Sequence, residues 1–196
     1  MSNQFKTKEM CDLVAAKLAE HDWHFERREF EDGECAIDTD ITSQSQLLRK
    51  YEIRMLFRRR AMQTIYYIPV MAPERVRGEM SEYLMHANSC TLHGKFVMDF
   101  GDGEIRYEMA TSLAEVEADV DSVLTRALDM LKATVDQYVT GLIAVAMGKL
   151  ASDAFASVVK AMNVPPQPPP LLPPVGNVED LAEEFEADQQ KKQKGE

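Results

Sequence analysis

Residues 96–109 carry the pattern that most constrains what this chain can fold into. Apolar and polar side chains alternate along 96–100 and again along 105–109, with Gly101-Asp102-Gly103 between the two runs. A period of two is typical of strands with one buried face, and glycine supplies the positive φ of a tight turn. We therefore predict a β-hairpin. Its buried face carries Phe96, Met98, Phe100, Ile105, Tyr107 and Met109, and its other face carries Lys95, Val97, Asp99, Glu104, Arg106 and Glu108.

Two earlier regions predict four more strands. Residues 51–57 alternate in the same way, and the β-branched and aromatic run 62–70 follows a turn at 58–61. Residues 25–30 and the run that begins at Cys35 flank an Asp32-Gly33 turn. We expect each pair to form a hairpin.

Helical spacing appears in three places. Residues 13–20 and 73–88 each predict one amphipathic helix, the second with Pro73 in its first turn. From Leu113 onward apolar residues recur every three or four positions, and the pattern resumes from Leu142 to Val158. The last region is either one helix of about fifty residues, roughly 75 Å long, or two helices broken near Thr140-Gly141.

These elements together predict the fold class. Their order is α-β-β-β-β-α-β-β-α, which describes an α+β domain whose antiparallel sheet has helices packed on one face. A long C-terminal helical extension and a tail follow.

The composition changes abruptly after residue 163. Seven of the nine prolines lie between Pro165 and Pro174, six acidic residues without a basic one follow in 177–188, and a short lysine run ends the chain. Such a segment offers little apolar area against the cost of ordering it. We therefore divide the chain into an α+β domain (1–137), a helical extension (138–163) and a disordered proline-rich linker with an acidic tail (164–196).

One stretch resembles a known family. A helix that ends at Asn88 is followed by Gly94-x-Phe96-x-x-Asp99 and then by a returning strand that begins with residues 102–107, Asp-Gly-Glu-Ile-Arg-Tyr. This combination resembles the YbjN family of bacterial proteins, which share the fold of type III secretion chaperones. The resemblance covers approximately residues 8–137. It implies a small module that acts through protein contacts and often dimerises, and it carries over no catalytic residue.

Charge and cysteine content narrow the functional classes. A net charge of −11 disfavours binding to nucleic acid and to anionic membranes, because both require basic surfaces. The longest uncharged apolar run, 138–148, is well short of the roughly 20 residues of a membrane span. Cys11, Cys35 and Cys90 are too few and too scattered for a disulfide framework and leave at least one free thiol. With no apolar signal-peptide core near residue 1, we expect a cytoplasmic protein.

Motifs with defined catalytic roles are missing from the sequence. His21 and His24 have helical metal spacing but lie where a helix gives way to a strand, so we assign no metal. Asp38 and Asp40 share one side of a strand, where a solvated sheet face explains them better than acid–base chemistry. We predict no catalytic residue and no cofactor.

The leading hypothesis is a non-enzymatic protein-binding module, chaperone-like or a regulatory adaptor, that acts on a protein client. The alternative is a small-ligand-binding or enzymatic domain with a pocket between sheet and helices, and a cluster of buried ionisable groups would favour it.

Several residues are candidate partner contacts. Arg58, Arg59 and Arg60 could receive an acidic partner or the chain's own tail, or could guard a sheet edge as a charged hairpin tip. The stripe with Leu142, Leu150 and Val158 exceeds what one small sheet can cover, so we expect a homodimer. The proline-rich segment is either a spacer or a ligand for an SH3-like groove, and the acidic segment either a recognition helix or a solvated tail. The full set is Arg58, Arg59, Arg60, Arg106, Leu142, Leu150, Val158, Pro170, Leu171, Leu172, Pro173, Leu181 and Phe185.

Overall fold

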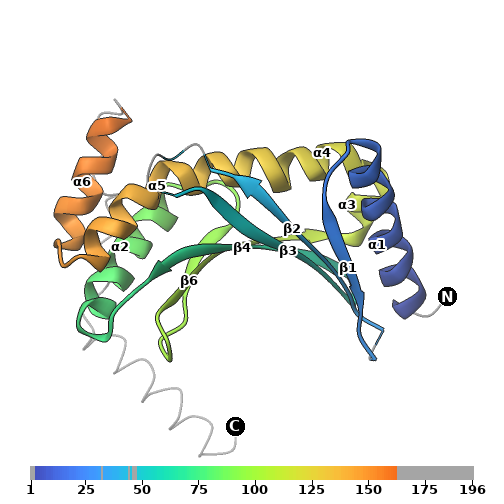
Figure 1. Cartoon of the computed structure of the whole chain (residues 1–196), viewed down its shortest axis with the longest axis horizontal. Helices are drawn as coiled ribbons and strands as arrows, with labels where there is room; N and C mark the ends of the chain where they lie inside the picture. The colour runs from blue at the N-terminus through green and yellow to red at the C-terminus, as the bar shows by residue number, and fades with distance from the viewer. Residues whose placement is uncertain (1–2, 32, 44, 46–47, 163–196) are drawn as a thin grey trace, which may run out of the picture. The chain divides into compact units, whose positions relative to one another are not determined.

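A computed structural model describes residues 3–31, 33–43, 45 and 48–162. The predicted α+β class and the order of the elements are confirmed (Figure 1). The elements are α1 (Asn3–Glu20), β1 (Phe25–Glu29), β2 (Cys35–Thr42), β3 (Lys50–Arg58), β4 (Ala61–Met71), the 3₁₀ turn η1 (Glu74–Val76), α2 (Arg77–Ser89), β5 (Lys95–Met98), β6 (Glu104–Ser112), α3 (Leu113–Ala118), α4 (Val120–Thr125), the π-helical turn η2 (Arg126–Met130), α5 (Leu131–Ala146) and α6 (Ala151–Ala161).

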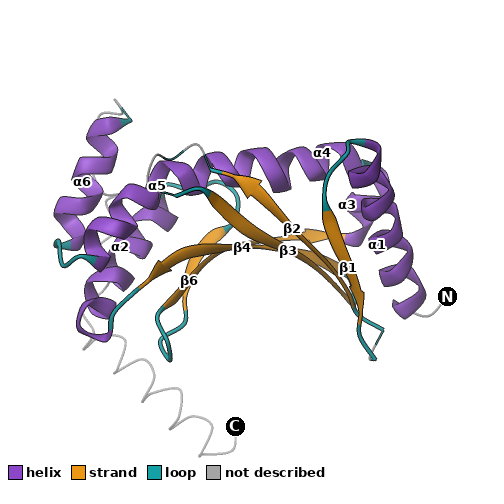
Figure 2. Cartoon of the chain, viewed as in Figure 1, coloured by secondary structure: helices purple, strands orange, loops and turns teal. Residues whose placement is uncertain are grey.

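All strands join one antiparallel sheet in the order β1-β2-β3-β4-β6-β5. Figure 2 shows α1, α4 and α5 along one face of this arched sheet, and no described element covers the opposite face. We call that uncovered side the open face.

The core lies between the sheet and the helices. Strand register lines up buried side chains in rows across the sheet, for example Ile53, Tyr66, Tyr107 and Phe96 on β3, β4, β6 and β5. The period of two seen in the sequence places such residues on one face, as predicted.

Four tyrosines are completely buried, and each hydroxyl donates to a backbone carbonyl or a carboxylate. Tyr66 on β4 reaches the carbonyls of Ala127 and Leu128 at 2.9 and 2.8 Å. These carbonyls lie in the π turn, where the ordinary helical bonding pattern is interrupted. The other three bonds run from Tyr51 to the Asp136 carboxylate, from Tyr83 to the Tyr138 carbonyl and from Tyr107 to the His93 carbonyl.

The C-terminal helical region breaks later than the sequence indicated. Both alternatives left open by the sequence are wrong: the region is not one continuous helix, and it does not break near Thr140-Gly141, because both residues lie inside α5. The chain turns at 147–150 instead, where Gly148 has a φ of 102°. Gly141 serves close packing: a Cβ there would lie 2.1 Å from the Tyr83 hydroxyl oxygen.

The apolar stripe expected to hold a second copy is covered within the chain. α6 folds back against α2 and α5, which buries Leu142 and Val158 to 0% and 5% exposure. Leu150 alone of the three predicted contacts stays exposed, at the start of α6. The stripe therefore no longer supports a homodimer. The predicted domain boundary at 137/138 falls inside α5, and residues 1–163 form one compact unit.

Phe100 differs from its predicted place. It is 64% exposed, because β5 ends at Met98 and the chain then enters a turn. In this turn the Asp99 N–H donates to the Glu104 carbonyl and the Gly103 N–H donates to the Asp99 carbonyl. The Phe100 side chain is therefore exposed to solvent, although its carbonyl accepts a hydrogen bond from the Arg77 guanidinium of α2 at 2.7 Å.

The cysteines also differ from expectation. Cys11 on α1 and Cys35 on β2 form a disulfide, while Cys90 is free and exposed. The pair lies 24 residues apart on two different elements, so only the packing of α1 on the sheet brings the sulfurs together. Structural disulfides are typical of oxidising compartments, which weighs against the cytoplasmic expectation.

None of the helices in the described part of the chain has the length and apolar character needed to cross a membrane. The predicted linker and tail, 164–196, lie outside the described residues.

The close approach at Gly141 yields a stability prediction. Gly141→Ala should lower the free energy of unfolding by about 1–3 kcal/mol, because the new Cβ must displace the Tyr83 ring. Urea denaturation followed by circular dichroism measures this change. Gly78→Ala in α2 is the matched control: no atom lies within 4 Å of its Cβ, so it should raise stability by about 0.4–1 kcal/mol. Equal effects at the two positions would contradict the packing role of Gly141.

The buried tyrosines predict a loss of stability in alkali. Burial raises the pKa of Tyr51, Tyr66, Tyr83 and Tyr107, and raises that of Tyr138 to about 12. Above pH 10 the unfolded chain therefore loses phenolic protons that the folded chain keeps. Each such group should cost about 1.4 kcal/mol per pH unit until its folded pKa is reached.

Urea unfolding at several values between pH 9 and 12 measures this slope. Tyr66→Phe should reduce the slope of the unfolding free energy against pH by the contribution of one titrating group. This variant therefore distinguishes the tyrosines from other groups that titrate in alkali. A slope that Tyr66→Phe leaves unchanged would rule out this role for Tyr66.

Candidate functional site

The open face is the candidate site, because alternate residues of every described strand project there and none of the described helices covers them. Its side chains follow from the register, which places opposite-charge residues on neighbouring strands. The charged and aromatic members are Glu26, Arg28, Asp38, Asp40, Lys50, Glu52, Arg54, Arg58, Tyr67, Lys95, Glu104, Arg106 and Glu108.

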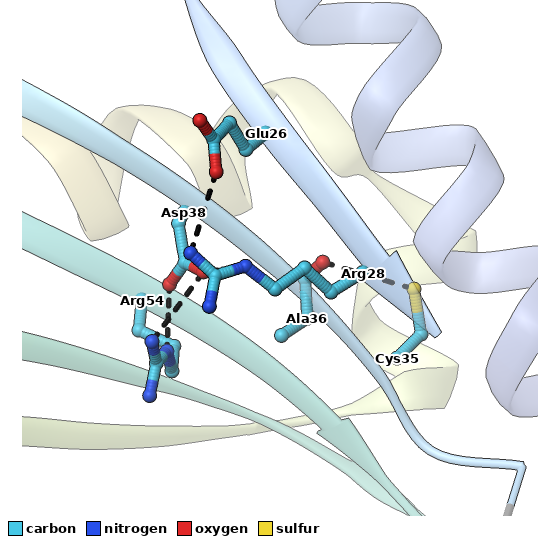
Figure 3. Close-up of polar contacts among 6 residues, drawn as sticks. All are labelled: Glu26, Arg28, Cys35, Ala36, Asp38 and Arg54. Atoms are coloured by element: carbon cyan, nitrogen blue, oxygen red, sulfur yellow. Dashed lines mark hydrogen bonds and ion pairs between the residues drawn. The ribbon is translucent and has the colours of Figure 1, made fainter. Parts of the chain in front are cut away.

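Asp38 on β2 is the centre of an ion-pair row (Figure 3). Its carboxylate accepts from the Arg54 Nε on β3 at 2.6 Å and lies 3.1 Å from the Arg28 Nε on β1. Arg28 in turn lies 3.3 Å from Glu26. Three strands are therefore joined on this face by alternating charges.

The row continues across the sheet. The Arg54 guanidinium lies 5.9 Å from the centre of the Tyr67 ring on β4, within the range of a cation–π contact. On β6, Arg106 lies 3.4 Å from Glu104 and 3.5 Å from Glu108, and Gln63 donates to Glu108 at 3.1 Å. Polar contacts therefore span the open face from β1 to β6.

These pairs are only partly shielded from water. Asp38 raises the pKa of Arg54, and Asp40 raises that of Lys50, each chiefly through a hydrogen bond to the charged form. The Asp38 side chain is 20% exposed and that of Arg28 is 54% exposed. Charges of this kind exchange one partner for another at small cost, which suits the binding of another polar surface.

Apolar residues lie beneath the charges. Leu56 on β3 and Ile65 on β4 also project to the open face, yet they are only 7% and 6% exposed. Long side chains of neighbouring strands cover such residues with their aliphatic stems. The open face is thus a mixed surface in which charged groups lie outermost.

The predicted arginine cluster is divided between different surroundings. Arg58 pairs with Glu34 at 2.7 Å. Arg59 and Arg60 lie exposed in the β3–β4 turn and make no ion pair within the described residues. Arg106 lies on the face predicted for it. The candidates Pro170, Leu171, Leu172, Pro173, Leu181 and Phe185 lie outside the described residues.

One polar cluster was missed by the sequence analysis. The Asp136 carboxylate on α5 accepts from the Tyr51 and Ser43 hydroxyls, each at 2.6 Å, and lies 3.4 Å from the Lys132 ammonium. Lys132 and Asp136 are only 12% and 11% exposed. The spacing of these two on one helix face was visible in the sequence, whereas the contact of Asp136 with Tyr51, 85 residues away, required the fold. These contacts hold the segment that follows β2, which begins with Ser43, against α5.

The space between sheet and helices, where the enzymatic alternative would have its pocket, is filled by the apolar core. A surface pocket of about 370 Å³ lies instead at the edge of the sheet, beside Gly94, Ala110 and Arg126. Neither Lys132 nor Asp136 lines it. Within the described residues, no three His, Cys, Asp or Glu side chains lie close enough together to hold a metal ion.

Comparisons with protein-family models, with curated proteins and with solved structures find no match to this chain. The resemblance to the YbjN family therefore stays a prediction.

The central position of Asp38 can be tested against its neighbour on the same strand face. Asp38→Asn should lower the free energy of unfolding by about 1 kcal/mol, because Arg54 then loses its carboxylate partner and Arg28 keeps only Glu26 among the described residues. Asp40→Asn is the matched control and should cost less, since Asp40 has one ion-pair partner in the described part of the chain, Lys50.

Thermal and urea unfolding of both variants should be measured at low salt and in 1 M NaCl. Salt should reduce the difference in unfolding free energy between the two variants, because 1 M NaCl shortens the Debye length to about 3 Å and so screens charges at partly exposed sites. A difference that persists unchanged in 1 M NaCl would show that charge is not its cause.

Proposed function

We propose that this protein is a non-enzymatic binding module that holds a protein client on its open face. The proposal rests chiefly on one observation: one whole face of the sheet is uncovered by the described helices, and it carries a row of partly exposed charges across β1, β2 and β3 that reaches Tyr67 on β4. A client with complementary charges would gain both attraction and a defined orientation from such a row.

The composition of the open face supports weak and adaptable contacts. Its charged side chains already form ion pairs with one another. A client must therefore replace these internal ion pairs with pairs of its own, and the net gain in binding free energy from each replacement is small. The shielded Leu56 and Ile65 add apolar area once the covering stems move aside. A chaperone-like or adaptor role, which releases its client again, fits such a surface.

A cytoplasmic location is the companion proposal. The low number of cysteines favours it, and the Cys11–Cys35 bond weighs against it. Acid quenching of intact cells followed by maleimide labelling of the denatured protein decides the matter, because both cysteines are buried in the folded chain. Labelling of Cys11 and Cys35 before reduction would support a reducing compartment, and labelling only after reduction would contradict it.

Photo-crosslinking tests the binding face in the full-length chain. A benzoylphenylalanine residue replaces Glu52, which is exposed on the open face, and in a matched variant replaces Glu74, which is exposed in η1. Neither glutamate makes an ion pair within the described residues, so both variants should fold. We expect discrete protein adducts from position 52 and none from position 74 after irradiation of cells of the source organism. Equal adducts from both positions, or none from position 52, would overturn the proposal.

A further inference from the structure

Both outermost strands of the sheet are protected against pairing with another strand. β1 has the sequence Phe-Glu-Arg-Arg-Glu, and its charges discourage edge-to-edge contact. β5 is capped by Asn88 of α2. The Asn88 carboxamide accepts from the Phe96 N–H at 2.6 Å and donates to the Phe96 carbonyl at 3.0 Å, as a neighbouring strand would.

One stretch of β6 lacks both kinds of protection. β5 pairs with β6 only as far as Lys95 opposite Glu108, whereas β6 continues to Ser112. Gly94, with a φ of 74°, turns the preceding chain away, and a Cβ there would lie 2.8 Å from the Glu108 carbonyl oxygen. Residues 109–112 therefore pair with β4 on one side, and no strand among the described residues pairs with them on the other.

The register shows which backbone groups face this gap. The Glu104 carbonyl accepts from Asp99 on the β5 side, and the Gly103 carbonyl accepts from Ala72 on the β4 side. Because bonding alternates along an antiparallel strand, the even-numbered residues of β6 point toward the β5 side. The N–H and C=O of Ala110 thus point past the end of β5, and neither has a hydrogen-bond partner within the described part of the chain.

The surface pocket of about 370 Å³ lies at this position. Its lining includes Ala110, and Leu92, which is 94% exposed, adds an apolar side chain. Two cations, Lys95 and Arg126, and two carboxylates, Glu108 and Glu115, also line it, so its formal charges cancel. An occupant would therefore be selected by main-chain hydrogen bonds and apolar contact rather than by charge.

We propose that this notch, formed by residues 92–95 and 109–111, binds an extended, uncharged peptide segment of a client protein. The segment lies along β6 in the line of β5, and one of its residues exchanges both main-chain hydrogen bonds with Ala110. This inference rests on the proposed function, because it assigns the same class of partner a second contact, at the sheet edge instead of the open face.

Hydrogen exchange on the full-length protein tests the notch directly. The probe is an acetylated and amidated hexapeptide that alternates threonine and valine, titrated to saturation and followed by NMR. We expect exchange of the Ala110 amide to slow at least tenfold. The amides of Met109 and Thr111 are internal controls and should change little, because they already donate toward β4. No saturable shift in 92–95 and 109–111 up to several millimolar, or equal protection at all three amides, would overturn the inference.

A variant pair tests the same contact. Ala110→Pro removes the outward donor without breaking a bond to β4, whereas Ala110→Val keeps the amide. Peptide affinity should fall about tenfold in the proline variant and stay within threefold in the valine variant. A folded Ala110→Pro protein with unchanged affinity would overturn the inference. If the proline variant fails to fold, the exchange measurement on the unaltered protein decides.

The two proposals fail separately. Crosslinks from position 52 without protection of Ala110 would remove the notch and leave the open face as the binding site. Protection of Ala110 without such crosslinks would remove the open face and leave the notch.

Discussion

The hydrogen bonds from the Tyr66 hydroxyl to the carbonyls of Ala127 and Leu128 fix where the long helical run crosses the sheet. Both carbonyls belong to a π turn, so their location along the helix is set together with the irregularity itself. With this point fixed, Tyr51 reaches Asp136 further along the helix, and Tyr83 of α2 reaches the carbonyl of Tyr138. One side of the sheet is thereby occupied, and the other side is left to the charged rows.

Local patterns predicted the strands well and the helix ends poorly. Alternation in 51–57 and 105–109 identifies one buried face wherever the chain is extended, which is a property of neighbouring residues alone. Phe100 continued the alternation but lies in a turn, because the pattern does not show where a strand ends. Gly141 looked like a helix breaker, yet the missing Cβ makes room for a tyrosine from another helix, which a local pattern cannot indicate.

The candidate site was predictable only in part for the same reason. The outward direction of Arg106 followed from the alternation of its own strand. The pairing of Asp38 with Arg54 depends on the register between two strands, and the meeting of Ser43 with Asp136 joins positions 93 residues apart. The gap beside Ala110 depends on unequal strand lengths, which the sequence pattern of the hairpin did not show.

The disulfide between Cys11 and Cys35 closes a covalent ring that contains the second half of α1, the turn at 21–24 and all of β1. A protease that cuts the chain once at this turn would open the backbone without separating the fragments. The nicked protein would migrate as one species on a non-reducing denaturing gel and would separate into two fragments once a reducing agent breaks the disulfide. Backbone continuity between the first helix and the edge strand is therefore dispensable for their staying together, provided that the surroundings are oxidising.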